Sequence, residues 1–123
     1  MKDREISGRR VLIVDDDGDF LTLLEKVISR KCNCEVRLST SGLEAMEIIG
    51  SWRPDVVLSD IMMPDLNGLE LLQRITAFDS TITTLIMTGY ATIEMAVKAL
   101  KDGAYDFYQK PFDNNEIVGA IQR

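Results

Sequence analysis

Polar side chains follow four short apolar runs of the sequence, and their types suit one reaction. They are two adjacent carboxylates, a third carboxylate, a hydroxyl and an ammonium: Asp15 with Asp16, Asp60, Thr88 and Lys110. Clustered carboxylates repel one another unless a cation joins them, and an all-oxygen site suits Mg²⁺. Asp60 can then attack phosphorus as a nucleophile and form an acyl phosphate. The mixture predicts phosphoryl transfer to Asp60, with Lys110 and Thr88 contacting the phosphoryl oxygens.

The run that ends at Asp60 is contiguous rather than alternating: Val56, Val57 and Leu58 precede Ser59 and the carboxylate. Such a run is typical of a strand buried on both faces, as in a parallel sheet covered by helices. Open parallel sheets bind ligands in the crevice at the carboxyl ends of their strands. Taken singly, each polar residue can be explained as a helix cap or a solvated side chain. The stronger evidence for a functional site is that four predicted strands all end at residues suited to the same reaction.

Short apolar runs alternate with amphipathic stretches along the whole chain. The pattern predicts strands at 11–14, 35–38, 56–60, 83–87 and 105–109, and helices that begin near Phe20, Gly42, Leu69, Ile93 and Asn114. Strict alternation of this kind predicts one α/β domain, a doubly wound five-stranded parallel sheet with helices on both faces. In such a sheet all strands point the same way, so their terminal residues gather at one edge.

Capping residues mark several helix starts. Ser41 and Glu44 have the spacing of a capping box, and Asp113 with Glu116 opens the last helix. Thr92 is expected to cap a helix whose apolar face is Ile93, Ala96, Val97 and Leu100, and which Gly103 ends.

Composition limits the classes of partner. The chain has 123 residues, 46% of them hydrophobic, and a net charge of -6, which disfavours direct binding to nucleic acid or to anionic membranes. No run is long enough to span a membrane and no secretory signal is visible, so a cytoplasmic location is expected. Cys32 and Cys34 cannot complete a zinc site in a chain without histidine, and ordinary reduced thiols are expected.

Four segments together resemble the receiver domain of bacterial two-component response regulators. They are Val11 to Asp17, Leu58 to Gly68, Ile86 to Tyr90 and Gln109 to Phe112, in the order and spacing of that family. The resemblance implies a flavodoxin-like sheet with strand order 2-1-3-4-5.

The resemblance also assigns roles to single residues. It implies that Asp60 is the phosphoacceptor, that Asp15 and Asp16 bind Mg²⁺ together with Asp60, and that the main-chain carbonyl of Met62 is a further ligand. Thr88 and Lys110 match the phosphate-contacting hydroxyl and lysine of the family.

Further implications concern switching and partners. Thr88 and Phe107 match the switch pair of the family, although Phe107 read from its spacing alone can equally be a fixed core residue. The Lys110–Pro111 bond is expected to be cis. Because the chain has no histidine, the phosphoryl group must come from outside, by resemblance from a sensor histidine kinase. A homodimer is expected through the helix after Thr92 and the strand 105–109, a face that includes Tyr90 and Met95, although these two can equally be scattered surface apolar residues.

The predicted domain organisation is a receiver domain at residues 10–123, preceded by an N-terminal arm at residues 1–9. The last helix is expected to be truncated and the effector domain to be absent. Residues 103–113 resemble receivers attached to activators of the alternative sigma factor, which implies transcription control, although receivers of hybrid kinases have similar ends.

Alternative functions stay open at this point. A Mg²⁺-dependent phosphohydrolase could use the same aspartate, but it would need a second carboxylate where Met62 stands. A flavin or nucleotide binder would need phosphate-binding donors after the first strand, where Asp15 to Asp17 would repel phosphate. A calcium loop starting at Asp15 fails because Phe20 and Lys26 occupy its glycine and glutamate positions. A signalling module that is not an enzyme is therefore preferred.

Overall fold

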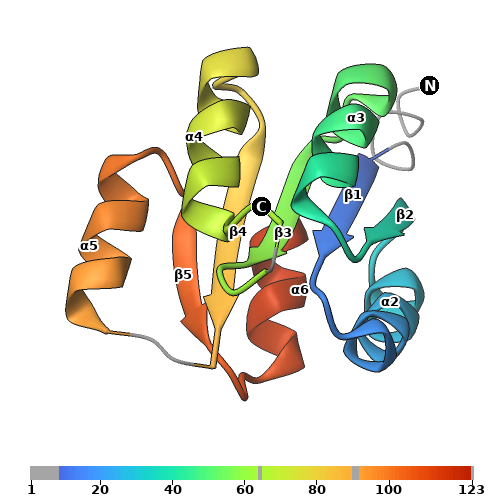
Figure 1. Ribbon diagram of the computed structural model, residues 1–123. Helices are drawn as coiled ribbons and strands as arrows, with labels where there is room; N and C mark the ends of the chain where they lie inside the picture. Colours follow the sequence, from blue (N-terminus) through green and yellow to red (C-terminus); the bar gives the residue numbers. More distant parts are fainter. Residues whose placement is uncertain (1–8, 64, 90–91, 123) are drawn as a thin grey trace.

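The computed structural model describes residues 9–63, 65–89 and 92–122 (Figure 1). Strands and helices alternate, and the five strands form one parallel sheet in the order β2-β1-β3-β4-β5, as predicted. The elements are β1 (Arg9–Val14), α2 (Gly18–Lys31), β2 (Cys34–Ser39), α3 (Gly42–Trp52), β3 (Val56–Asp60), α4 (Gly68–Phe78), β4 (Thr83–Thr88), α5 (Ile93–Lys101), β5 (Asp106–Gln109) and α6 (Asn114–Gln122).

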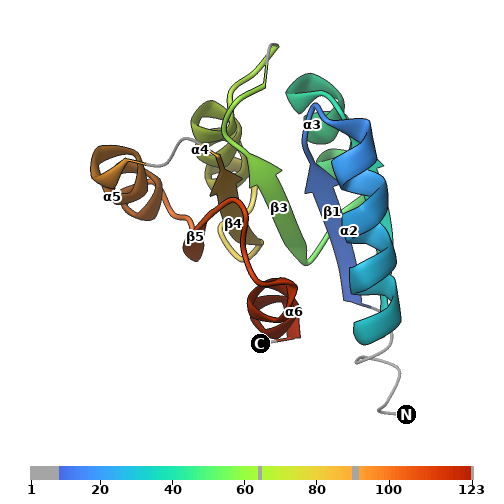
Figure 2. The same cartoon turned by 90° about the horizontal axis from the view of Figure 1, so that it is seen from below.

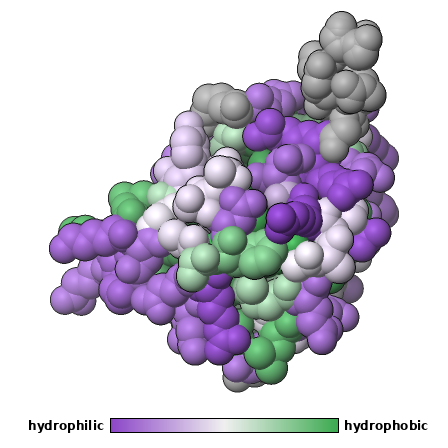
Figure 3. Space-filling model, turned by 90° about the horizontal axis from the view of Figure 1, so that it is seen from above, coloured by the Kyte–Doolittle hydropathy of each residue, from purple (hydrophilic) through white to green (hydrophobic). Residues whose placement is uncertain are grey.

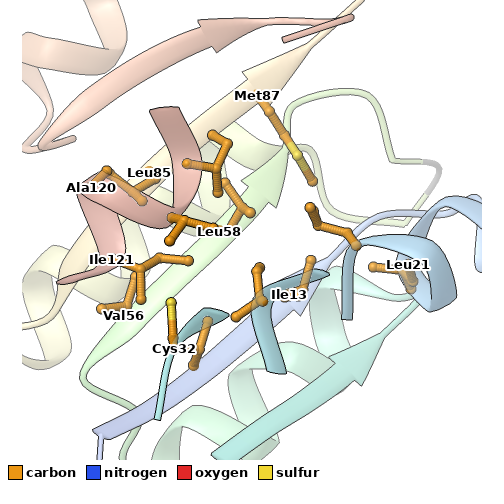
Figure 4. Close-up of a cluster of buried hydrophobic side chains, with 14 residues drawn as sticks. Ile13, Leu21, Cys32, Val56, Leu58, Leu85, Met87, Ala120 and Ile121 are labelled. Carbon is orange, nitrogen blue, oxygen red and sulfur yellow. The ribbon is translucent and has the colours of Figure 1, made fainter. Parts of the chain in front are cut away.

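Helices cover both faces of the sheet. Figure 2 shows α2 and α6 on one face and α3, α4 and α5 on the other. All five residues of the central strand β3 are buried, as its contiguous apolar run predicts. On the α2–α6 face, Ile13, Leu58 and Leu85 from three neighbouring strands meet Leu21 and Ile121 from the two helices (Figure 4).

The predicted capping boxes form only in part. At the start of α6 the Asp113 carboxylate accepts from the Asn115 N–H at 2.8 Å. Asp17, for which no cap was predicted, caps α2 and accepts hydrogen bonds from the main-chain N–H groups of Asp19 and Phe20. Ser41 Oγ accepts from the Glu44 N–H at 3.1 Å, but the Glu44 carboxylate accepts from Ser39 Oγ at 2.9 Å instead of reaching back to the Ser41 N–H. Only half of the predicted capping box is therefore present.

The expected inward face of α5 is wrong. Thr92 caps this helix and Gly103 follows it with a φ of +111°, as expected. The side chains that contact the sheet are those of Ala99 and Met95, whereas Ile93 is 84% exposed and Val97 and Leu100 are also exposed. The apolar stripe that periodicity identifies thus faces outward.

The two edges of the sheet differ in character. Figure 3 views the edge where the strands begin and shows a mainly hydrophilic surface with smaller hydrophobic patches. Near this edge the ring of Trp52, at the end of α3, contacts two guanidinium groups, with its centroid 5.5 Å from that of Arg10 and 4.6 Å from that of Arg37. Within the described ranges, no helix is long and apolar enough to cross a membrane.

Candidate functional site: an acidic cluster with a lysine

The polar residues predicted to meet do gather at the carboxyl edge of the sheet. Asp15 directly follows β1, Asp60 is the last residue of β3 and Thr88 the last residue of β4. Lys110 follows β5, and its N–H donates to the Thr88 carbonyl at 2.8 Å. Because β3 lies between β1 and β4, Asp60 is the central member of the group. Figure 2 views the sheet from this side.

Lys110 joins the two buried carboxylates. Its Nζ donates to Asp15 Oδ2 at 2.6 Å and to Asp60 Oδ2 at 3.3 Å. The Asp15 and Asp60 residues are 1% and 6% exposed, whereas Asp16 is exposed. One carboxylate oxygen from each of the three acids lies within 4.8 Å of the others. The predicted cluster of acids and ammonium is therefore present.

Main-chain donors hold both buried carboxylates in place. The Asp17 N–H donates to Asp15 Oδ1 at 2.9 Å, and the Met62 N–H donates to Asp60 Oδ1 at 3.2 Å. In each case a residue two positions later fixes the carboxylate, which leaves the second oxygen, Oδ2, directed to Lys110. Both acids thus present one oxygen to a cationic group.

Burial and charge shift the pKa values of the cluster in opposite senses. Burial raises the pKa of Asp15, even though the hydrogen bond and charge of Lys110 act to lower it. Burial would lower the pKa of Lys110, but the hydrogen bond and charge of Asp15, followed by those of Asp60, together outweigh burial and raise it. The lysine is therefore positively charged at neutral pH, and the cluster favours a further cation.

The donor set fits Mg²⁺. Three carboxylates converge at an edge of the sheet that is open to solvent on the side of Asp16, and hard oxygen donors with room for water are what Mg²⁺ prefers. The site residues include no histidine or cysteine, which would favour a transition metal. The main-chain carbonyl of Met62 stays a predicted fourth ligand.

The loop between β3 and α4 carries Met62 and is anchored at its far end by Asp65. This carboxylate accepts hydrogen bonds from Ser41 Oγ and from the N–H groups of Gly42 and Leu43, in the first turn of α3. The hydrogen bond from Ser41, followed by those of the main chain, holds the pKa of Asp65 well below its usual range. Sequence reasoning missed this anchor, because no local pattern pairs Asp65 with a helix more than twenty residues earlier.

The proposed switch pair occupies neighbouring strands. Thr88 is fully buried, and Phe107 is half-buried on β5, where its ring packs against a cluster that includes Ile61 and Ile86. A pocket of about 330 Å³ adjoins Phe107 and is also lined by Thr92, Ile93, Ala96 and Gln109 of α5 and the flanking segments. The Lys110–Pro111 bond is cis, as predicted. Tyr90 lies outside the described residues.

The two thiols are free, as expected. Burial raises the pKa of Cys32, and burial together with the neighbouring Cys32 raises the pKa of Cys34 to about 11. Both lie at the end of the molecule where the strands begin, away from the acidic cluster.

Comparison with known proteins agrees with the geometry. The sequence profile of the response regulator receiver domain matches residues 11–122. Regulatory protein AtoC of Escherichia coli (strain K12) is 35% identical over 114 residues, which are 93% of this chain but 24% of AtoC. Sporulation initiation phosphotransferase F of Bacillus subtilis (strain 168) is 34% identical over 116 residues, 94% of this chain and 93% of that protein. The chain thus spans about a quarter of the length of relatives such as AtoC.

Solved structures show the same architecture. A CheY-like receiver domain protein from Methanospirillum hungatei JF-1 superposes with a TM-score of 0.88 at 29% identity, covering 93% of this chain and 90% of that one. A beryllofluoride-activated NtrC4 receiver domain dimer, solved in solution, superposes with a TM-score of 0.86 at 28% identity, covering 92% and 93%.

Proposed function

The chain belongs to the response regulator receiver domain family of two-component systems, and from this premise we propose that Asp60 accepts the phosphoryl group. The observation that carries the proposal is the position of Asp60 at the centre of the carboxyl edge, with Oδ2 3.3 Å from the Lys110 ammonium and two further acids beside it. Asp15, the other buried acid, follows β1 next to β2, whereas Asp60 ends β3 between β1 and β4, the strands that lead to Asp15 and Thr88.

The proposed reaction is phosphoryl transfer from a phosphohistidine of a sensor kinase. A carboxylate oxygen of Asp60 attacks phosphorus, the P–N bond breaks, and its electron pair stays on the imidazole nitrogen, which takes up a proton. The product is an acyl phosphate on Asp60. Lys110 stabilises the charge on the phosphoryl oxygens, and the Thr88 hydroxyl donates a hydrogen bond to one of them.

Mg²⁺ is the proposed cofactor. Asp15, Asp16 and Asp60, with the Met62 carbonyl, would hold it. When bound, it supplies positive charge that offsets the charge developing on the transferred phosphoryl group. The chain's own contribution is to keep the three carboxylates converged through the main-chain hydrogen bonds at Asp17 and Met62.

Signalling rather than turnover is the proposed role. A phosphohydrolase of this type would place a second carboxylate two residues after Asp60, where Met62 stands with its side chain half exposed. Control of transcription through an effector domain is supported by likeness to AtoC, a regulatory protein. Likeness to a sporulation phosphotransferase favours a second candidate, an intermediate that passes the phosphoryl group on. The receiver boundaries 10–123, the arm 1–9 and the cytoplasmic location stay predictions.

Phosphorylation is proposed to act through Thr88 and Phe107. Thr88 moving toward the phosphoryl group would leave space for the Phe107 ring, which also lines the pocket shared with α5. Phe107 would then alter the surface of α5 and β5, the proposed dimer face, and the NtrC4 receiver is itself a dimer when activated. An identical Phe107 rotamer with and without a phosphoryl analogue would contradict this switch.

The chemistry is tested by measuring intact mass after incubation with acetyl phosphate and Mg²⁺. The native chain should gain the mass of one phosphoryl group, and Asp60→Ala should gain none. Asp55→Ala, which changes an acid at the opposite end of β3, is the matched control and should be modified like the native chain. Modification of Asp60→Ala to the native extent would refute Asp60 as the acceptor.

A further inference from the structure

The ammonium of Lys110 has a third neighbour besides its two carboxylates. Lys110 Nζ lies 4.4 Å from the centroid of the Phe20 ring, within the range of a cation–π interaction. Phe20 is on the first turn of α2 and belongs, by helical spacing, with the apolar residues that pack on the sheet. Its ring is only half-buried, and it faces a charged group.

The ring is held by the same loop that carries the lysine. Phe112, two residues after Lys110, packs edge-on against Phe20 with ring centroids 6.2 Å apart and an interplanar angle of 76°. Phe112 also packs edge-on against Tyr108 at 6.3 Å, and the Tyr108 hydroxyl donates to Asp106 at 3.2 Å. This chain of contacts fixes the face of Phe20 relative to the Lys110 backbone.

Two of the three groups that contact the ammonium have a second proposed role, and the third, Phe20, does not. Asp15 and Asp60 are also the proposed metal ligands, and Asp60 is the group that reacts. When they bind a divalent cation, their oxygens are shared between that cation and the Lys110 ammonium. The ring of Phe20 contacts the ammonium and is not a metal ligand. Of these three contacts, the Phe20 ring is the one that is neither a proposed metal ligand nor the reacting group.

We propose that Phe20 is a positioning residue for Lys110, whose ring face keeps the ammonium beside Asp60 while the carboxylates bind the metal. This inference rests on the proposed function of Asp60 and Lys110. Phe20 is not a catalytic residue, because it acts only through the lysine. An aromatic ring is therefore required at this position for fast phosphorylation, and an aliphatic side chain of similar volume does not replace it.

The test compares Phe20→Leu, which keeps apolar volume, with Phe20→Tyr, which keeps an aromatic face. With acetyl phosphate and saturating Mg²⁺, Phe20→Leu should lower the rate constant for modification of Asp60 about three- to tenfold, and Phe20→Tyr should stay within about twofold of the native chain. Phe78→Leu is the matched control, since the Phe78 ring stacks on Arg53 at 5.1 Å and does not contact the cluster. It should react like the native chain.

A double-mutant cycle separates positioning from a structural role. In a Lys110→Ala background the Phe20→Leu change should have no further effect on the rate. An equal loss with and without the lysine, or a native rate in Phe20→Leu, would overturn the inference. Failure of the native chain to become phosphorylated on Asp60 would instead refute the proposed function.

Proton NMR gives a readout that does not depend on activity. The ε-methylene protons of Lys110 should show an upfield ring-current shift in the native chain and in Phe20→Tyr, both before and after addition of Mg²⁺. This shift should be absent in Phe20→Leu. The same chemical shift in all three proteins would mean that the lysine does not lie over the ring in solution.

Discussion

At the scale of single residues, protonation of the Asp15 carboxyl makes the net charge of the site depend on pH. Burial raises its pKa, so at a given acidic pH a larger fraction of Asp15 is protonated than of an ordinary aspartate. A protonated carboxyl is a poor metal ligand, and protons therefore compete with Mg²⁺ at this position. The competition weakens Mg²⁺ binding as the pH falls.

We expect the dissociation constant for Mg²⁺ to begin rising on acidification at a pH above the usual titration range of aspartate, about 3.9. Asp15→Asn should weaken binding at neutral pH by about tenfold or more and remove this part of the pH dependence. Isothermal titration calorimetry between about pH 5 and about pH 8 measures both effects. Asp19→Asn, at an exposed acid on α2, should bind Mg²⁺ with native affinity and pH dependence. A flat profile for the native chain would contradict the role of Asp15.

Some residues of the site could be predicted from the sequence and others could not. The residue types at the strand ends were sufficient to predict that Asp15, Asp60 and Lys110 lie together, because a parallel sheet brings its strand ends to one edge whatever the details of packing. Phe20 and Asp65 were not identifiable in this way. Phe20 matches an ordinary apolar helix position, and its contact with Lys110 spans most of the chain.

At the scale of elements, the entry to α4 is the tightest point near the site. A Cβ at Gly68 would lie 2.3 Å from the Asp60 carbonyl oxygen and 2.7 Å from Ile61 Cα, both in the backbone. The Gly68 N–H also donates to the Ile61 carbonyl at 2.8 Å, which closes the loop that carries Met62. The helix can approach the end of β3 only because this residue has no side chain.

Gly68→Ala should therefore lower the free energy of unfolding by about 1–3 kcal/mol, because backbone must shift to accept the methyl group. Gly50→Ala is the matched control, because a Cβ at this exposed glycine of α3 would have nothing within 4 Å. That change should raise the free energy of unfolding by about 0.5–1 kcal/mol through helix propensity. Urea unfolding of both variants measures the difference. Native stability in Gly68→Ala would show that the loop relaxes easily.

Element types followed from the sequence and the strand boundaries agreed to within two residues, the largest difference being that β1 begins at Arg9. The orientation of α5 did not follow from the sequence. A stripe of apolar residues every three or four positions shows that a helix has an apolar side, and it does not show what that side meets. In α5 the small side chain of Ala99 faces the sheet, which lets the helix approach closely, while Val97 and Ile93 face outward. A face that is apolar and exposed is typical of an interaction surface.

At the scale of the whole molecule, this outward face predicts self-association. We expect the native chain to become dimeric when activated with beryllofluoride and Mg²⁺, as the NtrC4 receiver is under the same activating group. Val97→Lys places a charge in the apolar face and should keep the protein monomeric, with an unchanged unfolding midpoint because Val97 is 45% exposed. Sedimentation velocity measures the mass.

Leu23→Lys is the matched control for this prediction. Leu23 is an exposed apolar residue on α2, on the opposite face of the sheet, and its replacement should leave dimerisation unchanged. Loss of the dimer in Leu23→Lys but not in Val97→Lys would place the interface on α2 and contradict an interface on α5.

The position of Trp52 determines what optical methods can report. The chain has a single tryptophan, 7% exposed, whose ring contacts the guanidinium groups of Arg10 and Arg37 near the edge of the sheet where the strands begin. Its fluorescence should change when the domain unfolds and releases the indole from both cations, but should stay nearly constant when chemistry occurs at Asp60. A fluorescent reporter of phosphorylation would need an indole introduced at the other end of β3, for which exposed Met62 is a suitable position.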